Sequence, residues 1–108
     1  MLKVIIVDDE PRICKLILNL VNWNELGMEV VGIAHNGIDA LELIRNQAPN
    51  LVITDVRMPG YDGLEMIEEA KKHNQDLEFI LISGYEEFSY AQKAMSFGVK
   101  DCLCKPIK

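Results

Sequence analysis

Short apolar runs rich in β-branched residues alternate along the whole chain with stretches whose apolar residues recur at helical spacing. The runs are apolar along most of their length, which is typical of strands that are buried on both faces of a sheet. Because a helical stretch separates most runs, the pattern predicts an α/β fold with a parallel sheet covered by helices on both faces. The expected strands are residues 3–7, 29–34, 51–54, 78–82 and 99–104, and the expected helices are residues 11–21, 38–47, 64–73 and 88–97.

Two of the expected helices have a face that can be predicted from the spacing of their apolar residues. In the second, we expect Ile38, Leu41 and Ile44 to be buried. In the helix expected at residues 11–21, Pro11 is favourable in the first turn, because the N–H that proline lacks would have no hydrogen-bond partner within the helix there. The residues expected on its packed face are Ile13, Leu16, Ile17, Leu20 and Val21.

The chain has 108 residues, which fits one domain and not two. A further helix of about a dozen residues would complete the last strand-helix unit. The sequence stops before one, and a bare sheet face is costly to leave in water. We therefore expect residues 1–108 to be a single domain that is truncated before its final helix.

The charge and the cysteines restrict the partners and the compartment. A net charge of −6 argues against direct binding of nucleic acid or of an anionic membrane by this segment. The apolar run at the start is too short for a signal peptide, and no segment approaches the roughly 18 apolar residues of a membrane helix. We expect a cytoplasmic protein in which Cys14, Cys102 and Cys104 are buried, reduced thiols.

Acidic residues stand where two of the expected strands end. Asp8 and Asp9 follow the first strand and Asp55 follows the third, and the carboxyl ends of parallel strands are where sites form. Two carboxylates about 4 Å apart repel by about 4 kcal/mol at an effective dielectric constant of about 20. A hard divalent cation would offset that repulsion, and Mg²⁺ is the natural candidate. The alternative is that Asp9 or Glu10 caps the first helix and that Asp55 is a turn residue.

The fourth and fifth strands end in residues of complementary chemistry. Ser83 offers a hydroxyl and Lys105 offers an ammonium group. Together with the acids and a metal ion they would form a phosphoryl site, in which Asp55 could be the nucleophile that becomes an aspartyl phosphate. Ser83 alone could be a turn serine and Lys105 alone a solvated lysine. The presence of such groups at four strand ends at once favours the phosphoryl site.

Four motifs at these strand ends are similar to those of a known family: VDDE, TDVRMPGYDG, ISGY and KDCLCKP. On them, the chain resembles the receiver domain of bacterial two-component response regulators. The resemblance implies a flavodoxin-like sheet of five strands in the order 2-1-3-4-5. It also implies that Asp55 accepts a phosphoryl group from a sensor histidine kinase. The other implied roles are Mg²⁺ binding by Asp8, Asp9, Asp55 and the backbone carbonyl of Arg57, a switch hydroxyl on Ser83, and phosphate binding by Lys105.

Two longer stretches, NWNELGMEVVGIAHNGIDALELI and FSYAQKAMSFGVKD, resemble receivers that precede an AraC-type DNA-binding domain. This narrower resemblance implies a transcriptional effector beyond the segment, and it is this effector that would bind DNA. We also expect the receiver to form a homodimer on phosphorylation. One position departs from the family. Cys102 stands where receivers usually carry an aromatic residue, which puts the usual coupling of Ser83 to the partner surface in doubt.

Other functions are compatible with part of this pattern. A phosphate-independent pseudo-receiver would bind a partner with the same fold, although the acids, Ser83 and Lys105 are all present. A metal-dependent phosphatase of the haloacid dehalogenase type would need a second acid at the position of Arg57, so we expect a phosphoacceptor that phosphorylates itself and not a turnover enzyme. A flavin-binding domain would need a loop that binds phosphate after the first strand. Three acids, residues 8–10, occupy that turn, which argues against this function.

Overall fold

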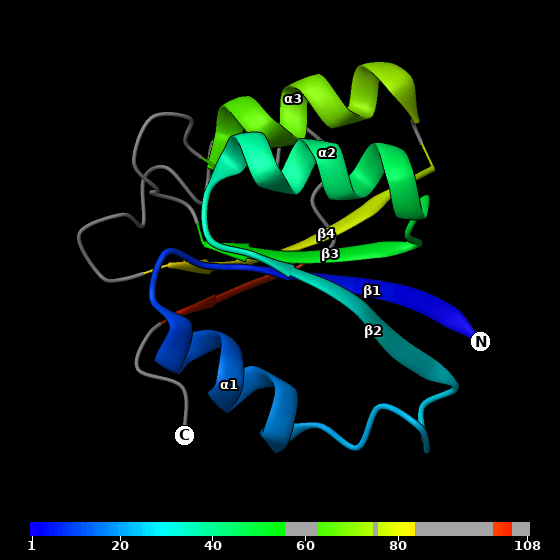
Figure 1. Ribbon diagram of the computed structural model, residues 1–108, viewed down its shortest axis with the longest axis vertical. Coiled ribbons are helices and arrows are strands. Elements are labelled where there is room, and N and C mark those ends of the chain that lie inside the picture. The colour runs from blue at the N-terminus through cyan, green and yellow to red at the C-terminus, as the bar shows by residue number, and fades with distance from the viewer. Residues whose placement is uncertain (56–62, 75, 84–100, 105–108) are drawn as a thin grey trace.

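A five-stranded parallel sheet in the order β2-β1-β3-β4-β5 forms the centre of the protein (Figure 1). The computed structural model describes residues 1–55, 63–74, 76–83 and 101–104. Helix α1 covers one face of the sheet, and α2 and α3 cover the other. The elements are β1 (Leu2–Val7), α1 (Pro11–Leu20), β2 (Met28–Ala34), α2 (Gly37–Gln47), β3 (Leu51–Asp55), α3 (Gly63–His73), β4 (Glu78–Ser83) and β5 (Asp101–Cys104).

The predicted fold class and strand order are confirmed, and the described elements begin or end within about two residues of the expected positions. One of these small differences concerns a predicted site residue. Asp55 is the last residue of β3 and not the first residue after it, because it still pairs with Ile82 of β4. The expected helix at 88–97 lies outside the described residues.

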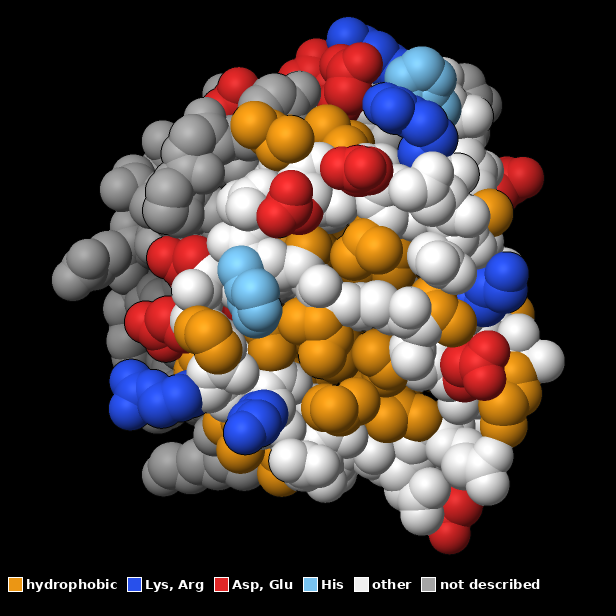
Figure 2. All heavy atoms as spheres, in the orientation of Figure 1, with side chains coloured by type: hydrophobic (Ala, Val, Ile, Leu, Met, Phe, Trp, Pro, Cys, Tyr) orange, Lys and Arg blue, Asp and Glu red, His pale blue; other side chains and the backbone are white. Residues whose placement is uncertain are grey.

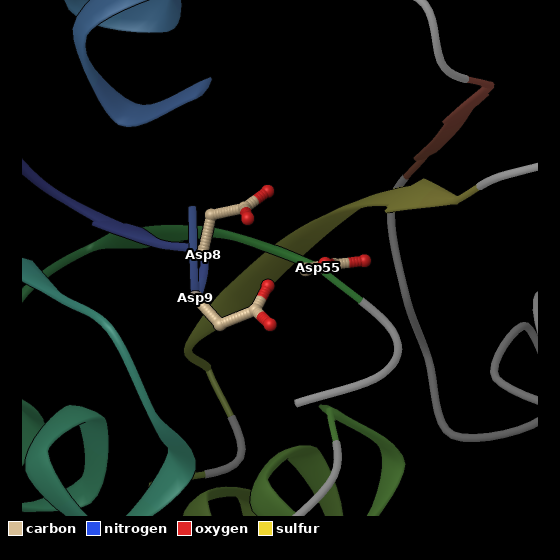
Figure 3. A group of neighbouring side chains, drawn as sticks. All are labelled: Asp8, Asp9 and Asp55. Atoms are coloured by element: carbon tan, nitrogen blue, oxygen red, sulfur yellow. The ribbon is translucent and has the colours of Figure 1, made fainter. Parts of the chain in front are cut away.

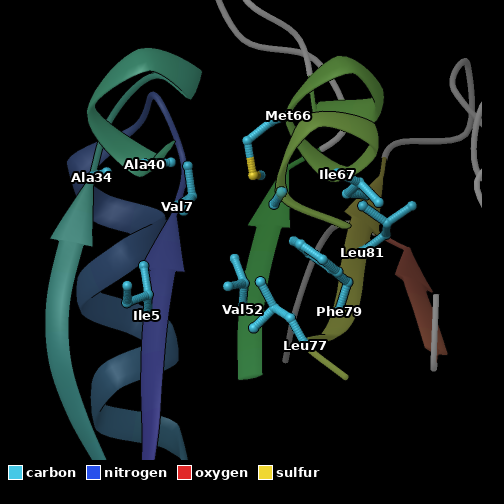
Figure 4. Close-up of a cluster of buried hydrophobic side chains, with 11 residues drawn as sticks. Ile5, Val7, Ala34, Ala40, Val52, Met66, Ile67, Leu77, Phe79 and Leu81 are labelled. Atoms are coloured by element: carbon cyan, nitrogen blue, oxygen red, sulfur yellow. The ribbon is translucent and has the colours of Figure 1, made fainter. Parts of the chain in front are cut away.

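The alternation of side chains along the central strands builds a separate core on each face of the sheet. Ile5 and Val7 of β1 point toward α2 and α3, where they join Phe79 and other buried residues (Figure 4). Val4 and Ile6 of the same strand point the other way, toward α1. Burial on both faces explains why the strand sequence is continuously apolar and not alternating.

Helix α1 packs through a narrower stripe than its apolar pattern predicts. Cys14 and Ile17 are buried, and Ile13 is partly buried against the same cluster. Leu16 and Leu20, which were expected on the packed face, are 36% and 47% exposed. Each helical position is rotated by about 100° from the one before it, so Leu16 and Leu20 both fall on the same side of the stripe formed by Cys14 and Ile17, beside the sheet contact and not on it. Cys14 is a buried thiol, as predicted.

Helix α2 differs from the prediction at one of its three expected positions, since Leu41 and Ile44 are partly buried and pack against the core. Ile38 was expected to be buried and is 65% exposed, while Gly37 and Ala40 are buried. The helix starts at Gly37, where Asn36 Oδ1 caps it by accepting a hydrogen bond of 2.8 Å from the N–H of Asp39. The buried face passes through positions 37 and 40, and position 38 lies about 100° away from position 37, in solvent.

Strand β2 lies at the outer edge of the sheet and contains a bulge. Val4 pairs with Val30 but Ile5 pairs with Gly32, so Val31 is an extra residue in β2. Figure 2 shows hydrophobic side chains gathered in the middle of the face that carries β2, between α1 and α2. The side chain of Leu43 in α2 packs closely against Gly32. A Cβ at position 32 would lie 3.1 Å from Cδ1 and Cδ2 of Leu43.

Within the described residues, no helix has the length and apolar character that crossing a membrane requires.

Replacement of Asn36 by Ala should destabilise the protein, because it removes the acceptor that caps α2. We expect a loss of about 1 kcal/mol in the free energy of unfolding, measured by urea denaturation. Asn46→Ala is the matched control, since Asn46 is exposed on the same helix and does not cap it. Equal stabilities of the two variants would show that the cap does not set the start of α2.

Candidate functional site

The ends of β1 and β3 bring acidic residues together. These two strands are parallel neighbours, and Val7 pairs with Thr54, so the next residues, Asp8 and Asp55, emerge side by side. Asp9 follows in the turn that leads to α1 (Figure 3). One carboxylate oxygen from each of Asp8, Asp9 and Asp55 lies within 4.8 Å of the others. We call these three residues the acid cluster.

The members of the acid cluster differ in burial. Asp8 is fully buried and Asp55 is 5% exposed, whereas Asp9 is exposed. Oδ1 of Asp8 accepts a hydrogen bond of 2.9 Å from the N–H of Glu10, which shapes the turn. The acid cluster therefore has two carboxylates at the bottom and one at the mouth, open to a ligand from solvent.

The alternative in which an acid simply caps the first helix is wrong for these residues. Glu10 occupies the N-cap position of α1, but its side chain makes no capping hydrogen bond. The carbonyl of Glu10 instead accepts from the N–H groups of Ile13 and Cys14, at 3.0 and 3.3 Å. Capping of α1 therefore does not explain why Asp8 and Asp9 gather with Asp55.

The acid cluster fits a hard divalent cation. All three side chains offer carboxylate oxygens, the ligand type that Mg²⁺ prefers, and their spacing allows one ion to contact them together. Without a counter-charge, three carboxylates this close repel one another strongly. Asp8, Asp9 and Asp55 are therefore the residues that would hold Mg²⁺.

The other predicted site residues can be placed only in part. Ser83 is the last residue of β4 and directly follows Ile82, the partner of Asp55, so its backbone lies at the same edge of the sheet. Ser83 pairs with Cys104 of β5, the residue before Lys105. Lys105 itself and Arg57 lie outside the described residues.

A residue that the sequence analysis did not select also reaches the acid cluster. His35 directly follows β2, and its Nδ1 lies 2.9 Å from the main-chain oxygen of Asp8. Applying the rule about strand ends to β2, as to the other four strands, would have found it.

The sequence profile of a family described as "Response regulator receiver domain" matches residues 4–108. The chain belongs to this family. The receiver domain is 43% identical to a Bacillus subtilis protein named "Uncharacterized transcriptional regulatory protein YesN", over 98% of this chain and 29% of that protein. It is 34% identical to the "Transcriptional regulatory protein HptR" of Staphylococcus aureus, over 99% of this chain and 42% of that protein. The receiver domain thus spans less than half the length of these two relatives.

Solved structures of receiver domains share the fold. The REC domain of AraT, a response regulator from Geobacillus stearothermophilus, superposes with a TM-score of 0.95 at 41% identity, over 99% of this chain and 83% of that one. A two-component transcriptional regulator AraC from Clostridium phytofermentans gives a TM-score of 0.91 at 33% identity, over 100% of this chain and 84% of that one. The predicted resemblance to the receivers of AraC-type response regulators is therefore confirmed.

Mg²⁺ should raise the Tm of this receiver domain, because an ion that binds only the folded acid cluster stabilises it by mass action. At about 100 times the dissociation constant the gain is about 2.7 kcal/mol. Asp9→Ala should shrink the shift, since Asp9 is an exposed member whose loss leaves no cavity. In EDTA the same variant should melt above the wild type, because one repelling charge is gone.

The matched control for this prediction is Asp76→Ala, which removes an exposed carboxylate before β4, at the opposite end of the sheet. It should keep the full Mg²⁺ shift. Identical Tm values for the wild type in EDTA and in Mg²⁺ would contradict the metal assignment.

Proposed function

We propose that this receiver domain accepts a phosphoryl group on Asp55 from a sensor histidine kinase, in a reaction that depends on Mg²⁺, and thereby switches an attached effector. The observation that carries the proposal is the approach of the three carboxylates to within 4.8 Å at the carboxyl end of the sheet. Such an arrangement is costly unless a cation or a proton is bound, and a bound cation leaves room for a phosphoryl oxygen.

In the proposed transfer, a carboxylate oxygen of Asp55 attacks phosphorus, and an acyl phosphate bond forms as the bond from phosphorus to the donor's imidazole nitrogen breaks. The electron pair of the broken bond stays on the imidazole, which then takes a proton from solvent. Bound Mg²⁺ would supply positive charge that neutralises the phosphoryl oxygens. The position of Asp55 at the rigid end of a central strand holds the nucleophile in a fixed direction.

The remaining residues have distinct tasks in this proposal. Asp8, Asp9 and the backbone carbonyl of Arg57 hold the cation with Asp55, and the ammonium group of Lys105 binds a phosphoryl oxygen. The hydroxyl of Ser83 donates to another phosphoryl oxygen and reports the phosphorylated state. Support for Ser83 is the strand register, which sets its backbone one residue beyond the partner of Asp55.

The proposed effector is a transcriptional regulator. Support comes from relatives that are named transcriptional regulatory proteins and that are much longer than this chain. In such an arrangement the receiver domain contacts the kinase, while DNA is bound by the effector and not by this acidic segment. The cytoplasmic location, the homodimer formed on phosphorylation and the end of the domain before a final helix stay predictions.

The proposal can be tested by incubating the protein with Mg²⁺ and a small phosphodonor and measuring the intact mass. We expect one phosphate adduct on the wild type and none on Asp55→Ala, because the nucleophile is absent. Asp76→Ala is the control carboxylate and should be modified like the wild type. EDTA should abolish the adduct in every variant.

Different outcomes would support the other functions. No adduct on the wild type in saturating Mg²⁺ would contradict the proposal and favour a pseudo-receiver. Continuous release of free phosphate over many turnovers would favour a phosphatase.

A further inference from the structure

One main-chain carbonyl lies between two members of the acid cluster, and side chains from two other elements hold it. The carbonyl oxygen of Asp8 is 2.9 Å from Nδ1 of His35 and 3.6 Å from Sγ of Cys14. A carbonyl can only accept, so both contacts are donations, from the ring N–H of His35 and from the thiol of Cys14. The N–H of Asp8 donates to the carbonyl of Ala34 at 3.0 Å. Two consecutive residues, Ala34 and His35, therefore hold Asp8 on both sides.

The orientation of this carbonyl determines how the first two acids stand relative to each other. The peptide between Asp8 and Asp9 is planar, so its carbonyl turns together with the whole plane. A turn of the plane changes ψ of Asp8 and φ of Asp9 and moves the two carboxylates apart or together. Their oxygens lie within 4.8 Å, so their repulsion acts on this plane directly.

The bond from His35 is the stronger of the two restraints. Its donor-acceptor distance of 2.9 Å is that of an ordinary N–H···O bond, whereas the thiol is a weak donor at 3.6 Å. Nδ1 carries a proton both in the neutral tautomer that makes this bond and in the imidazolium. The restraint therefore does not depend on the charge of the ring.

We infer that His35 is a positioning residue for the acid cluster: its Nδ1–H fixes the plane of the peptide between Asp8 and Asp9 and so holds both carboxylates in place for the cation. This inference rests on the proposed Mg²⁺-dependent phosphorylation. His35 acts from the end of the edge strand β2, so it extends the site to a third strand beyond β1 and β3.

Three substitutions of His35 distinguish the effect of its N–H donor from the effect of its ring. His35→Ala removes both, and His35→Phe keeps a ring but has no donor. His35→Asn places an amide N–H at the same number of bonds from the backbone as Nδ1, so it can restore the hydrogen bond. His35 is exposed, so these changes leave no internal cavity. His73→Ala, an exposed histidine at the end of α3, is the matched control.

The measurement is Mg²⁺ affinity by titration calorimetry, together with the Mg²⁺ dependence of the phosphorylation rate with a small phosphodonor. For His35→Ala and His35→Phe we expect affinity to fall about 3- to 10-fold, the size of one net hydrogen bond. The half-saturating Mg²⁺ concentration should rise by the same factor, while the rate at saturating Mg²⁺ stays close to that of the wild type. His35→Asn and His73→Ala should match the wild type in both measurements.

The outcomes distinguish this inference from the proposed function and from a purely structural role. If the wild type binds Mg²⁺ and is phosphorylated but the Ala and Phe variants have unchanged Mg²⁺ affinity, only the inference is overturned. Lower stability in urea without a change in Mg²⁺ affinity has the same meaning, because it shows a structural role alone. If the wild type binds no Mg²⁺ and forms no adduct, the proposed function fails, and the inference fails with it. If the Ala variant does not fold, the Phe and Asn variants decide the question.

Discussion

The parallel pairing of β1 with β3 is the constraint on which the site depends. Its register sets Val7 opposite Thr54, and the next residue on each strand is an acid. Each pair of carboxylates at about 4 Å costs about 4 kcal/mol at an effective dielectric constant near 20, so a flexible chain would separate them. Strands buried on both faces cannot shift without exposing their core, and the sheet therefore holds the charges together. The two cores therefore keep the three carboxylates close enough for one cation to contact them together.

Much of this arrangement could be predicted because the relevant signals are local and redundant. Continuous apolar runs identified strands buried on both faces, and the motifs that resemble receivers gave the order in which they pair. Once the strands were known, the rule that sites form at carboxyl ends indicated where Asp8, Asp9 and Asp55 would meet, and the structure brings them together. The roles of Ser83, Lys105 and Arg57 stay predictions.

Other features could not be predicted because they depend on partners from distant elements. Ile38 is exposed because the packed face of α2 passes through Gly37 and Ala40, small residues that give a weaker hydrophobic signal than Ile38 does. Leu16 is exposed because only the stripe of α1 that contains Cys14 and Ile17 faces the sheet. The strand-end rule places His35 at the same edge of the sheet, but its contact with the main-chain carbonyl of Asp8, 27 positions away, could not be predicted because a main-chain acceptor leaves no mark in the sequence.

The bulge in β2 has a consequence for the sheet as a whole. An open sheet exposes a row of N–H and C=O groups on its outermost strand, and such a row invites a strand from another molecule to add to it. The extra residue at Val31 breaks the regular spacing of these groups, so an incoming straight strand cannot stay in register past the middle of β2. The irregularity thus hinders the addition of a further strand along β2.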